Sequence, residues 1–147
     1  MRHPLYPELQ PVSKADKLKS EVEAMIRNDN WNAANPTHIV LLHCLCHERV
    51  YGVETPEKTG KEFVIARTHA ARILRDQFHE NNQAMVEFIQ WFWRREQSRE
   101  KWRRDNNSPS TFRADWRIVF NAKAITDYRL DIARNAERLI IDKGQHK

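Results

Sequence analysis

The chain has 147 residues and a formal net charge of +5, and 40% of its residues are hydrophobic, 31% charged and 10% aromatic. A sequence with five Trp and six Phe has enough apolar surface to form a core, which excludes disorder for most of the chain. No apolar run exceeds four residues, whereas a transmembrane helix needs about 20, so a membrane span is excluded as well.

The pattern of apolar residues and helix caps predicts an arm, six helices and a tail, in that order. Proline recurs in residues 1–12 without periodicity, so this segment is predicted to be an extended N-terminal arm. Ser13 is a good N-cap for the first helix, Asn35 before a proline marks the start of the second, and Gly52 ends it. The predicted helices span about residues 13–27, 36–51, 61–79, 83–104, 111–120 and 122–141, followed by a tail at 143–147.

These elements predict an all-α fold, a single compact domain of five to six helices over residues 13–142 behind the arm. Residues 116–120 also have the composition of a short strand, but their neighbours favour a helix. The last helix is expected to pack through an apolar stripe at helical spacing, formed by Ile125, Tyr128, Ile132, Ala136 and Leu139.

The two cysteines and the start of the chain bear on the compartment. Cys44 and Cys46 are two residues apart, so on a helix they point to different faces and an intramolecular disulfide is unfavourable. The proline-rich start lacks the apolar stretch of a secretory signal. We therefore expect a protein of a reducing, cytoplasmic compartment.

The excess positive charge is confined to the second part of the chain. Residues 1–84 contain 11 basic and 11 acidic side chains, whereas residues 85–147 contain 14 basic and 9 acidic ones. The second part therefore carries the whole charge of +5. Such an uneven distribution of basic charge is typical of nucleic-acid binders.

Residues 85–120 combine this charge with aromatic side chains. Arg and Lys contact phosphates and an exposed aromatic ring stacks on an unpaired base, so the segment is a candidate nucleic-acid interface. In the other interpretation the basic residues form a solvated helix face, in which Glu96 pairs with Arg99 and Glu100 with Arg104. Each Trp is expected to be buried. The tryptophans are Trp91, Trp93, Trp102 and Trp116, and the candidate binding residues are Arg94, Arg95, Arg99, Lys101, Arg103, Arg104, Arg113 and Arg117.

A second cluster has side chains that can bind metal. His43, Cys46 and His47 share one face of the predicted second helix, and His69 or His79 is available as a fourth zinc ligand. Zinc ligands usually come in two separated pairs, and the sequence has no second closely spaced pair, so we favour core packing and predict no metal. We predict no cofactor and no enzymatic activity either, because nucleophile motifs, phosphate-binding glycine loops and clustered carboxylates are absent from the sequence.

Residues 85–93 read Met-Val-Glu-Phe-Ile-Gln-Trp-Phe-Trp. This run resembles the Tyr-x-x-x-Ile-x-x-x-Trp signature of DnaD-like replication proteins, the group of helicase loaders and phage replisome organisers. Ile89 and Trp93 fall on the second and third signature positions, and Met85 stands where the family has an aromatic residue.

The resemblance extends over about residues 61–117. Residues 107–116 look like the turn and short helix that follow the signature helix in the family. The resemblance implies a small α-helical C-terminal domain that binds single- and double-stranded DNA and recruits a helicase. The winged-helix N-terminal domain typical of the family is not evident in residues 1–60.

Two functions remain open at this point. The first is a DNA-binding accessory protein of phage or mobile-element replication or recombination, which contacts single- or double-stranded DNA with low specificity and has a replicative helicase as a possible partner. The second is a helical protein-interaction module, an adaptor or inhibitor of a host or phage protein, because Trp and Arg are also common in interfaces. The apolar content around Trp91 and Trp102 is also compatible with a homodimer.

Overall fold

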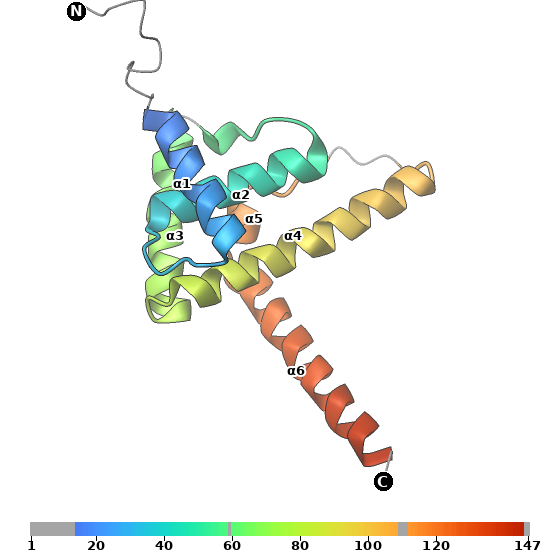
Figure 1. The fold of residues 1–147 in the computed structure, drawn as a ribbon. Coiled ribbons are helices and arrows are strands. Elements are labelled where there is room, and N and C mark those ends of the chain that lie inside the picture. Colours follow the sequence, from blue (N-terminus) through green and yellow to red (C-terminus); the bar gives the residue numbers. More distant parts are fainter. Residues whose placement is uncertain (1–13, 59, 109–111, 146–147) are drawn as a thin grey trace, which may run out of the picture.

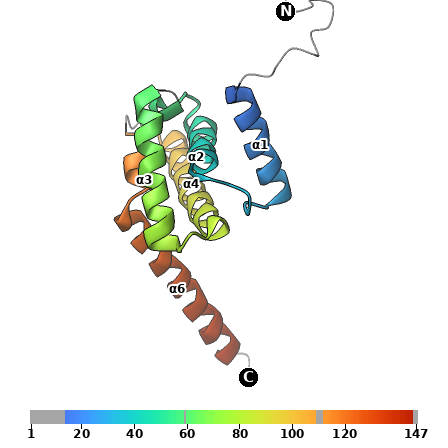
Figure 2. The same ribbon diagram turned by 90° about the vertical axis from the view of Figure 1, so that its left-hand side faces the viewer.

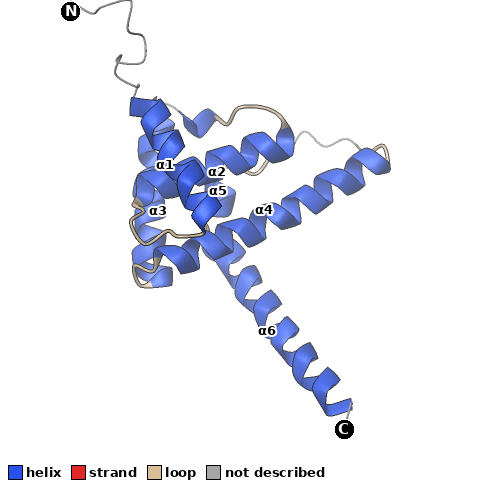
Figure 3. Ribbon diagram, in the orientation of Figure 1, coloured by secondary structure: helices blue, strands red, loops and turns tan. Residues whose placement is uncertain are grey.

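The computed structural model describes residues 14–58, 60–108 and 112–145, and the predicted arm at residues 1–12 lies outside them. Every regular element of this described part is helical, which confirms the predicted all-α fold (Figure 1, Figure 3). Within the same ranges, no helix combines the length and the apolar character needed to cross a membrane. The elements are α1 (Lys14–Asn28), α2 (Pro36–Tyr51), the 3-10 helix η2 (Pro56–Lys58), α3 (Gly60–Phe78), α4 (Asn82–Asp105), α5 (Trp116–Val119) and α6 (Ala122–Gln145).

Helix α2 lies at the centre and contacts α1, α3, α4 and η2. Its sequence is apolar on most faces, and Ile39 and Val40 are fully buried. The Asn35 side chain accepts a hydrogen bond from the His38 backbone N–H while the His38 ring accepts one from the Asn35 N–H, which closes a capping box. Gly52 ends the helix with a φ of 73°, a left-handed conformation that favours glycine. The predicted bounds of α2 are therefore confirmed.

Helix α3 and the first part of α4 pack against α2 and complete the core. Phe88, Ile89 and Phe92 of α4 are at most 2% exposed. Trp31, from the connection between α1 and α2, is fully buried. Figure 2 shows α1 and α3 on opposite sides of α2. Burial of each large apolar side chain contributes about 1.5–3 kcal/mol, so this packing holds α4 firmly at its start.

The predicted helix at 111–120 is shorter in the structure. Helix α5 comprises only Trp116–Val119, and residue 111 lies outside the described ranges. The Asp115 side chain accepts a hydrogen bond from the Arg117 N–H and so caps the helix. The Phe120 N–H donates to the Trp116 carbonyl at 2.9 Å, so residues 116–120 form a helical turn rather than the alternative strand.

Helix α6 packs against the rest of the molecule only through its first half. Ile125 is 1% exposed. The Tyr128 ring lies 5.4 Å from the Phe88 ring and 5.3 Å from the Trp91 ring, between centroids. These contacts fix the angle at which α6 leaves the other helices.

The second half of α6 extends away from the body (Figure 1). Residues 132–140 are all exposed. The expectation that Ile132 and Leu139 pack with the first half of the stripe is therefore wrong: these side chains are 48% and 62% exposed. The stripe does run along one face of a helix, but the helix is longer than the body on which it packs.

Candidate nucleic-acid interface

Helix α4 has two parts with different surroundings. Its inner half, residues 82–96, packs on the body, and Glu96, which is 3% exposed, is its last buried residue. Its outer half, residues 97–105, extends past the packed helices (Figure 1); we call it outer α4. Outer α4 therefore presents much of its side-chain surface to solvent.

Two of the candidate binding residues on α4 are held by carboxylates of the same helix. An Arg99 Nη1 atom lies 3.1 Å from Glu96 Oε1, which confirms the expected pair. An Arg103 Nη1 atom lies 2.7 Å from Glu100 Oε1. The expected partner of Glu100 was Arg104, so that prediction is wrong. Arg103 is also a helical neighbour of Glu100, and both side chains are half-buried, whereas Arg104 is exposed.

Arg95 is stacked rather than free. Its guanidinium carbon lies 4.4 Å from the centroid of the Trp91 ring and 5.5 Å from that of Phe92. Burial and the nearby Arg99 lower the pKa of Arg95, and Asp127 of α6 opposes them. The Arg95 Nε atom is buried without a hydrogen-bond partner in the described part of the chain. Arg95 therefore serves the junction of α4 and α6 more than an external ligand.

Three cations of α4 remain available. Arg94, Lys101 and Arg104 are exposed, and no carboxylate of the described residues forms an ion pair with any of them. On a helical wheel Arg94 and Lys101 lie on the face opposite the inner core contacts, whereas Arg104 lies in line with the buried Val86 but beyond the packed part of the helix. These side chains can approach an anionic partner without breaking an internal contact.

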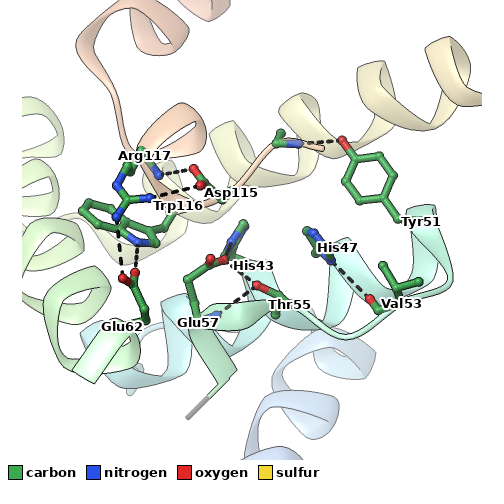
Figure 4. Close-up of polar contacts among 11 residues, drawn as sticks. His43, His47, Tyr51, Val53, Thr55, Glu57, Glu62, Asp115, Trp116 and Arg117 are labelled. Carbon is green, nitrogen blue, oxygen red and sulfur yellow. Dashed lines mark hydrogen bonds and ion pairs between the residues drawn. The ribbon is translucent and has the colours of Figure 1, made fainter. Parts of the chain in front are cut away.

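The segment that returns from α4 to α5 is fixed by hydrogen bonds to the body. The Ala114 N–H donates to the Tyr51 hydroxyl at 3.0 Å, and that hydroxyl donates to Glu96 Oε2 at 3.0 Å. The Trp116 Nε1–H donates to Glu62 Oε2 at 2.9 Å (Figure 4). Burial, followed by the charge of Glu96, raises the pKa of Tyr51 to about 12, so its hydroxyl stays protonated as a donor.

The last two candidate binding residues lie on this returning segment. Arg117 is 3.6 Å from Glu62 and 3.5 Å from Asp115, and it lies over the Trp116 ring at 5.1 Å (Figure 4). Arg113 is exposed, and no described carboxylate pairs with it. Arg117 is thus neutralised locally, whereas Arg113 resembles the free cations of α4.

The four tryptophans of this region also differ in exposure. Trp93 and Trp116 are 3% and 8% exposed, which confirms their predicted burial. Trp91 is half-buried, and its Nε1–H donates to Asp131 Oδ2 of α6 at 2.8 Å. Trp102 is 61% exposed, so its predicted burial is wrong. Trp102 shares a helix face with Trp91, but α6 has diverged from α4 at that distance from the body (Figure 1).

The alternative metal ligands are engaged with other partners. His43 Nε2 lies 3.0 Å from Glu57 Oε2, and the His47 Nδ1–H donates to the Val53 carbonyl at 3.3 Å (Figure 4). Burial raises the pKa of the Cys46 thiol to about 12, which disfavours the thiolate that zinc requires. His69 instead packs against Trp116 at 5.3 Å, and His79 is exposed. No group of three His, Cys, Asp or Glu in the described ranges is arranged to hold a metal ion.

Sequence reasoning missed a buried polar cluster between α2 and the connection that follows it. Glu57 of η2 is 2% exposed and accepts hydrogen bonds from His43 and from the Thr55 hydroxyl. Burial raises the pKa of Glu57, but the hydrogen bonds from His43 and Thr55 outweigh it and hold that pKa below its ordinary value. The cluster fastens the connection between α2 and α3 to the core. No sequence pattern points to this cluster, because Glu57 lies in a polar linker and its partner His43 is 14 residues away.

Comparison with protein-family models, with curated proteins and with solved structures finds no match for this chain. Its function is therefore inferred from the side chains of outer α4 and from the resemblance of residues 85–93 to the DnaD-like signature.

Proposed function

We propose that the chain is a DNA-binding accessory protein of phage or mobile-element replication or recombination, and that outer α4 is its nucleic-acid interface. One observation carries the proposal: outer α4 carries both an exposed aromatic ring, Trp102 at 61% exposure, and two exposed cations without ion-pair partners among the described residues, Lys101 and Arg104. Single-strand binders combine exposed aromatic rings with cations that contact the backbone.

Each side chain has a defined role in this proposal. The Trp102 ring stacks on an unpaired base, which contributes about 1–3 kcal/mol and tolerates any sequence. Lys101, Arg104 and Arg94 bind phosphates, which adds affinity that depends strongly on salt. The distance along the helix from Arg94 to Arg104 is about 15 Å at a rise of about 1.5 Å per residue. Because a paired base offers no free face to Trp102, single-stranded DNA is the preferred ligand.

The role in replication rests on the resemblance to DnaD-like proteins. The three signature positions, Met85, Ile89 and Trp93, are at most 3% exposed. They support the proposal indirectly. Their packing fixes the inner half of α4 to the body, and outer α4 therefore extends into solvent. The recruitment of a replicative helicase is part of the same proposal.

The test compares two triple variants of the full chain with equal charge change. The first is Arg94→Glu, Lys101→Glu and Arg104→Glu; the control is Lys17→Glu, Lys19→Glu and Arg27→Glu on exposed positions of α1. Fluorescence anisotropy of labelled single-stranded DNA at about 50 mM salt, where phosphate contacts are strong, measures the affinity. We expect the α4 variant to lose binding and the α1 variant to keep most of it.

Two results contradict the proposal. The first is wild-type protein that binds neither single- nor double-stranded DNA at this salt concentration. The second is an equal loss in the two triple variants, since this would show that only the net charge matters. Arg99 and Arg103 are left unchanged because their substitution by Glu would break the ion pairs with Glu96 and Glu100 and place like charges together.

A second candidate function has one observation in its favour. A groove of about 320 Å³ between α4 and the start of α6 is lined by the aromatic and aliphatic side chains of Phe92, Phe112 and Ile118, with Arg99 and Lys123 at the same groove. Apolar side chains next to Arg are typical of protein interfaces. This groove favours a peptide segment of a protein partner. If the wild type binds no DNA, binding of a protein partner through this groove becomes the favoured function.

A further inference from the structure

A groove between the start of α2 and the middle of α3 is lined by arginines. Its volume is about 540 Å³. The α3 side carries Arg67, Arg72 and Arg75, and Ala71 adds only a methyl group to this side. Residues 35–37 form the α2 side, and no carboxylate is among the described residues that line the groove. All the charged side chains that line it are therefore positive. We call this surface the α2–α3 groove.

Two of the three arginines are free to bind a ligand. Arg67 and Arg72 are exposed, and neither forms an ion pair with a carboxylate in the described part of the chain. Arg75 is paired instead, since its Nε atom lies 2.9 Å from Asp76 Oδ1. An anion that enters the α2–α3 groove can therefore bind Arg67 and Arg72 without breaking an internal contact.

The start of α2 forms the other wall of the groove but adds few hydrogen-bond donors. Pro36 has no backbone N–H. The Asn35 side chain already accepts a hydrogen bond from the His38 N–H at 3.1 Å. The capacity of the groove to bind an anion therefore comes from the arginines of α3.

The spacing of these arginines fits a row of phosphates. Arg67 and Arg75 are eight residues apart, which is about 12 Å along the helix at about 1.5 Å per residue. One DNA strand carries a phosphate about every 3.4 Å along the duplex axis, so this length matches about three phosphates. A guanidinium group binds two phosphate oxygens at once through its parallel N–H groups. A polyanion with regularly spaced phosphates therefore fits the groove better than a single small anion.

We propose that the α2–α3 groove is a second DNA contact, which binds the phosphate backbone of duplex and single-stranded DNA alike. This inference rests on the proposed function, because it takes DNA as the ligand. No aromatic ring is among the described residues that line the groove, so an unpaired base finds no stacking surface there. Outer α4 differs in this respect, because the exposed Trp102 favours single strands. The α2–α3 groove thus adds affinity for duplex DNA, which outer α4 does not favour.

The two proposed contacts lie at different ends of α4. The Asn82 Nδ2–H donates to the Ala34 carbonyl at 2.8 Å, so the start of α2 lies beside the start of α4. Trp102 is 20 residues further along α4, at a distance of about 30 Å along the helix. Figure 1 shows α3 beside the start of α4 and outer α4 at the other end. Substitutions in the groove should therefore leave outer α4 intact, and their effects should add to those of the α4 variant.

Substitution of the free arginines tests the groove by fluorescence anisotropy of labelled duplex and single-stranded DNA. The groove variant of the full chain is Arg67→Glu with Arg72→Glu, and the matched control is Lys17→Glu with Lys19→Glu on exposed positions of α1. Arg75 is left unchanged because of its ion pair. We expect the groove variant to lose about tenfold or more in duplex affinity at about 50 mM salt. Its slope of log K against log salt should be shallower by about 1.8, since each lost contact to a duplex phosphate removes about 0.9. The control should keep the wild-type slope.

A second variant separates the shape of the arginine side chain from its charge. Arg67→Lys with Arg72→Lys keeps both charges but loses the fork that binds two phosphate oxygens. We expect it to keep the wild-type slope and to bind duplex DNA less tightly than the wild type but more tightly than the groove variant. Thermal melting checks that all variants are folded, which is expected because the substituted positions are exposed.

Three results would overturn the inference. The first is a groove variant that melts like the wild type and keeps its duplex affinity and slope; the role of outer α4 would still stand if the α4 triple variant loses single-strand binding. The second is an equal loss in the groove variant and the α1 control, because only net charge would then matter. The third comes from isothermal titration with inorganic phosphate. If the groove variant loses phosphate binding but keeps its DNA affinity, the ligand is a small phosphorylated molecule and not DNA.

The opposite pattern would support the groove and contradict outer α4. In that case the groove variant loses duplex affinity and slope, whereas the α4 triple variant binds single-stranded DNA like the wild type. The two sets of substitutions therefore distinguish a failure of this inference from a failure of the interface proposed on outer α4.

Discussion

The two halves of α4 belong to one helix but differ in what surrounds them. The inner half buries Phe88, Ile89 and Phe92 against the body. Outer α4 carries an aromatic residue as well, but Trp102 is 61% exposed. The difference shows that an aromatic side chain on a helix is buried only where a neighbouring helix is long enough to cover it. Inner α4 supports the fold, and outer α4 is available for a ligand.

The largest effect is expected for the inner half. Phe92→Ala removes a side chain that is 2% exposed and leaves a cavity, so it should lower the free energy of unfolding by about 3–5 kcal/mol. The matched outer substitution, Trp102→Ala, should change stability by no more than about 0.5 kcal/mol. Denaturant unfolding of both variants measures the contrast. Equal destabilisation would show that outer α4 is part of the core.

The next effect concerns the cluster that holds η2 on the body. Glu57→Gln removes the charge that His43 and Thr55 stabilise, and should cost about 1.5–3 kcal/mol of unfolding free energy at about pH 7. Glu48→Gln is the control, because Glu48 forms its ion pair with Lys58 nearer the surface, at 3.0 Å. Urea unfolding should show a larger loss of unfolding free energy for Glu57→Gln than for Glu48→Gln.

The same cluster predicts the direction of the pH dependence. The pKa of Glu57 is held below its unfolded value of 4.5 by the hydrogen bonds from His43 and Thr55, so the stability it contributes is present above that pH and lost as the pH falls further. Burial lowers the pKa of His47 below 6.5, so stability is also lost as the pH falls through this range. Stability should therefore decline on acidification, and Glu57→Gln should flatten the lower part of the decline. A wild type that gains stability between about pH 7 and about pH 4 would contradict both assignments.

A smaller effect is expected on binding by outer α4. Trp102→Ala should weaken single-stranded DNA binding by about 1–3 kcal/mol, since one stacking contact is lost. Trp102→Phe should retain most of the affinity, and Ile65→Ala, an exposed residue of α3, should retain all of it. Duplex affinity should change less, because stacking requires an unpaired base. Equal losses for single strands and duplex would argue against stacking.

Local signals sufficed for much of this fold. Asn35 and Gly52 set the bounds of α2 through hydrogen bonds and a left-handed φ that neighbouring residues determine. The burial of Trp93 was expected because large aromatic side chains seldom stay exposed without a partner, and Trp93 is 3% exposed. The exposure of Trp102 could not be predicted in this way, since it depends on where α6 diverges from α4.

Contacts between residues that are far apart in the sequence could not be predicted either. The sequence shows that all eight candidate binding residues are cationic. Which of them can bind a ligand depends on the carboxylates that pair with them in the folded chain. Arg117 is held by Glu62, which is 55 positions away in the chain. The burial of Glu57 depends likewise on His43, across a turn whose path the sequence did not indicate. Such contacts follow from tertiary packing, which no local pattern encodes.

The central claim is that Arg94, Lys101 and Arg104 contact phosphates, and the salt dependence of binding to single-stranded DNA tests it most directly. Each lost phosphate contact lowers the slope of log K against log salt by about 0.7, so the triple glutamate variant should have a slope shallower by about 2. The control with Lys17, Lys19 and Arg27 replaced by Glu should keep the wild-type slope. A triple glutamate variant with an unchanged slope would contradict the assignment of DNA binding to these cations of α4.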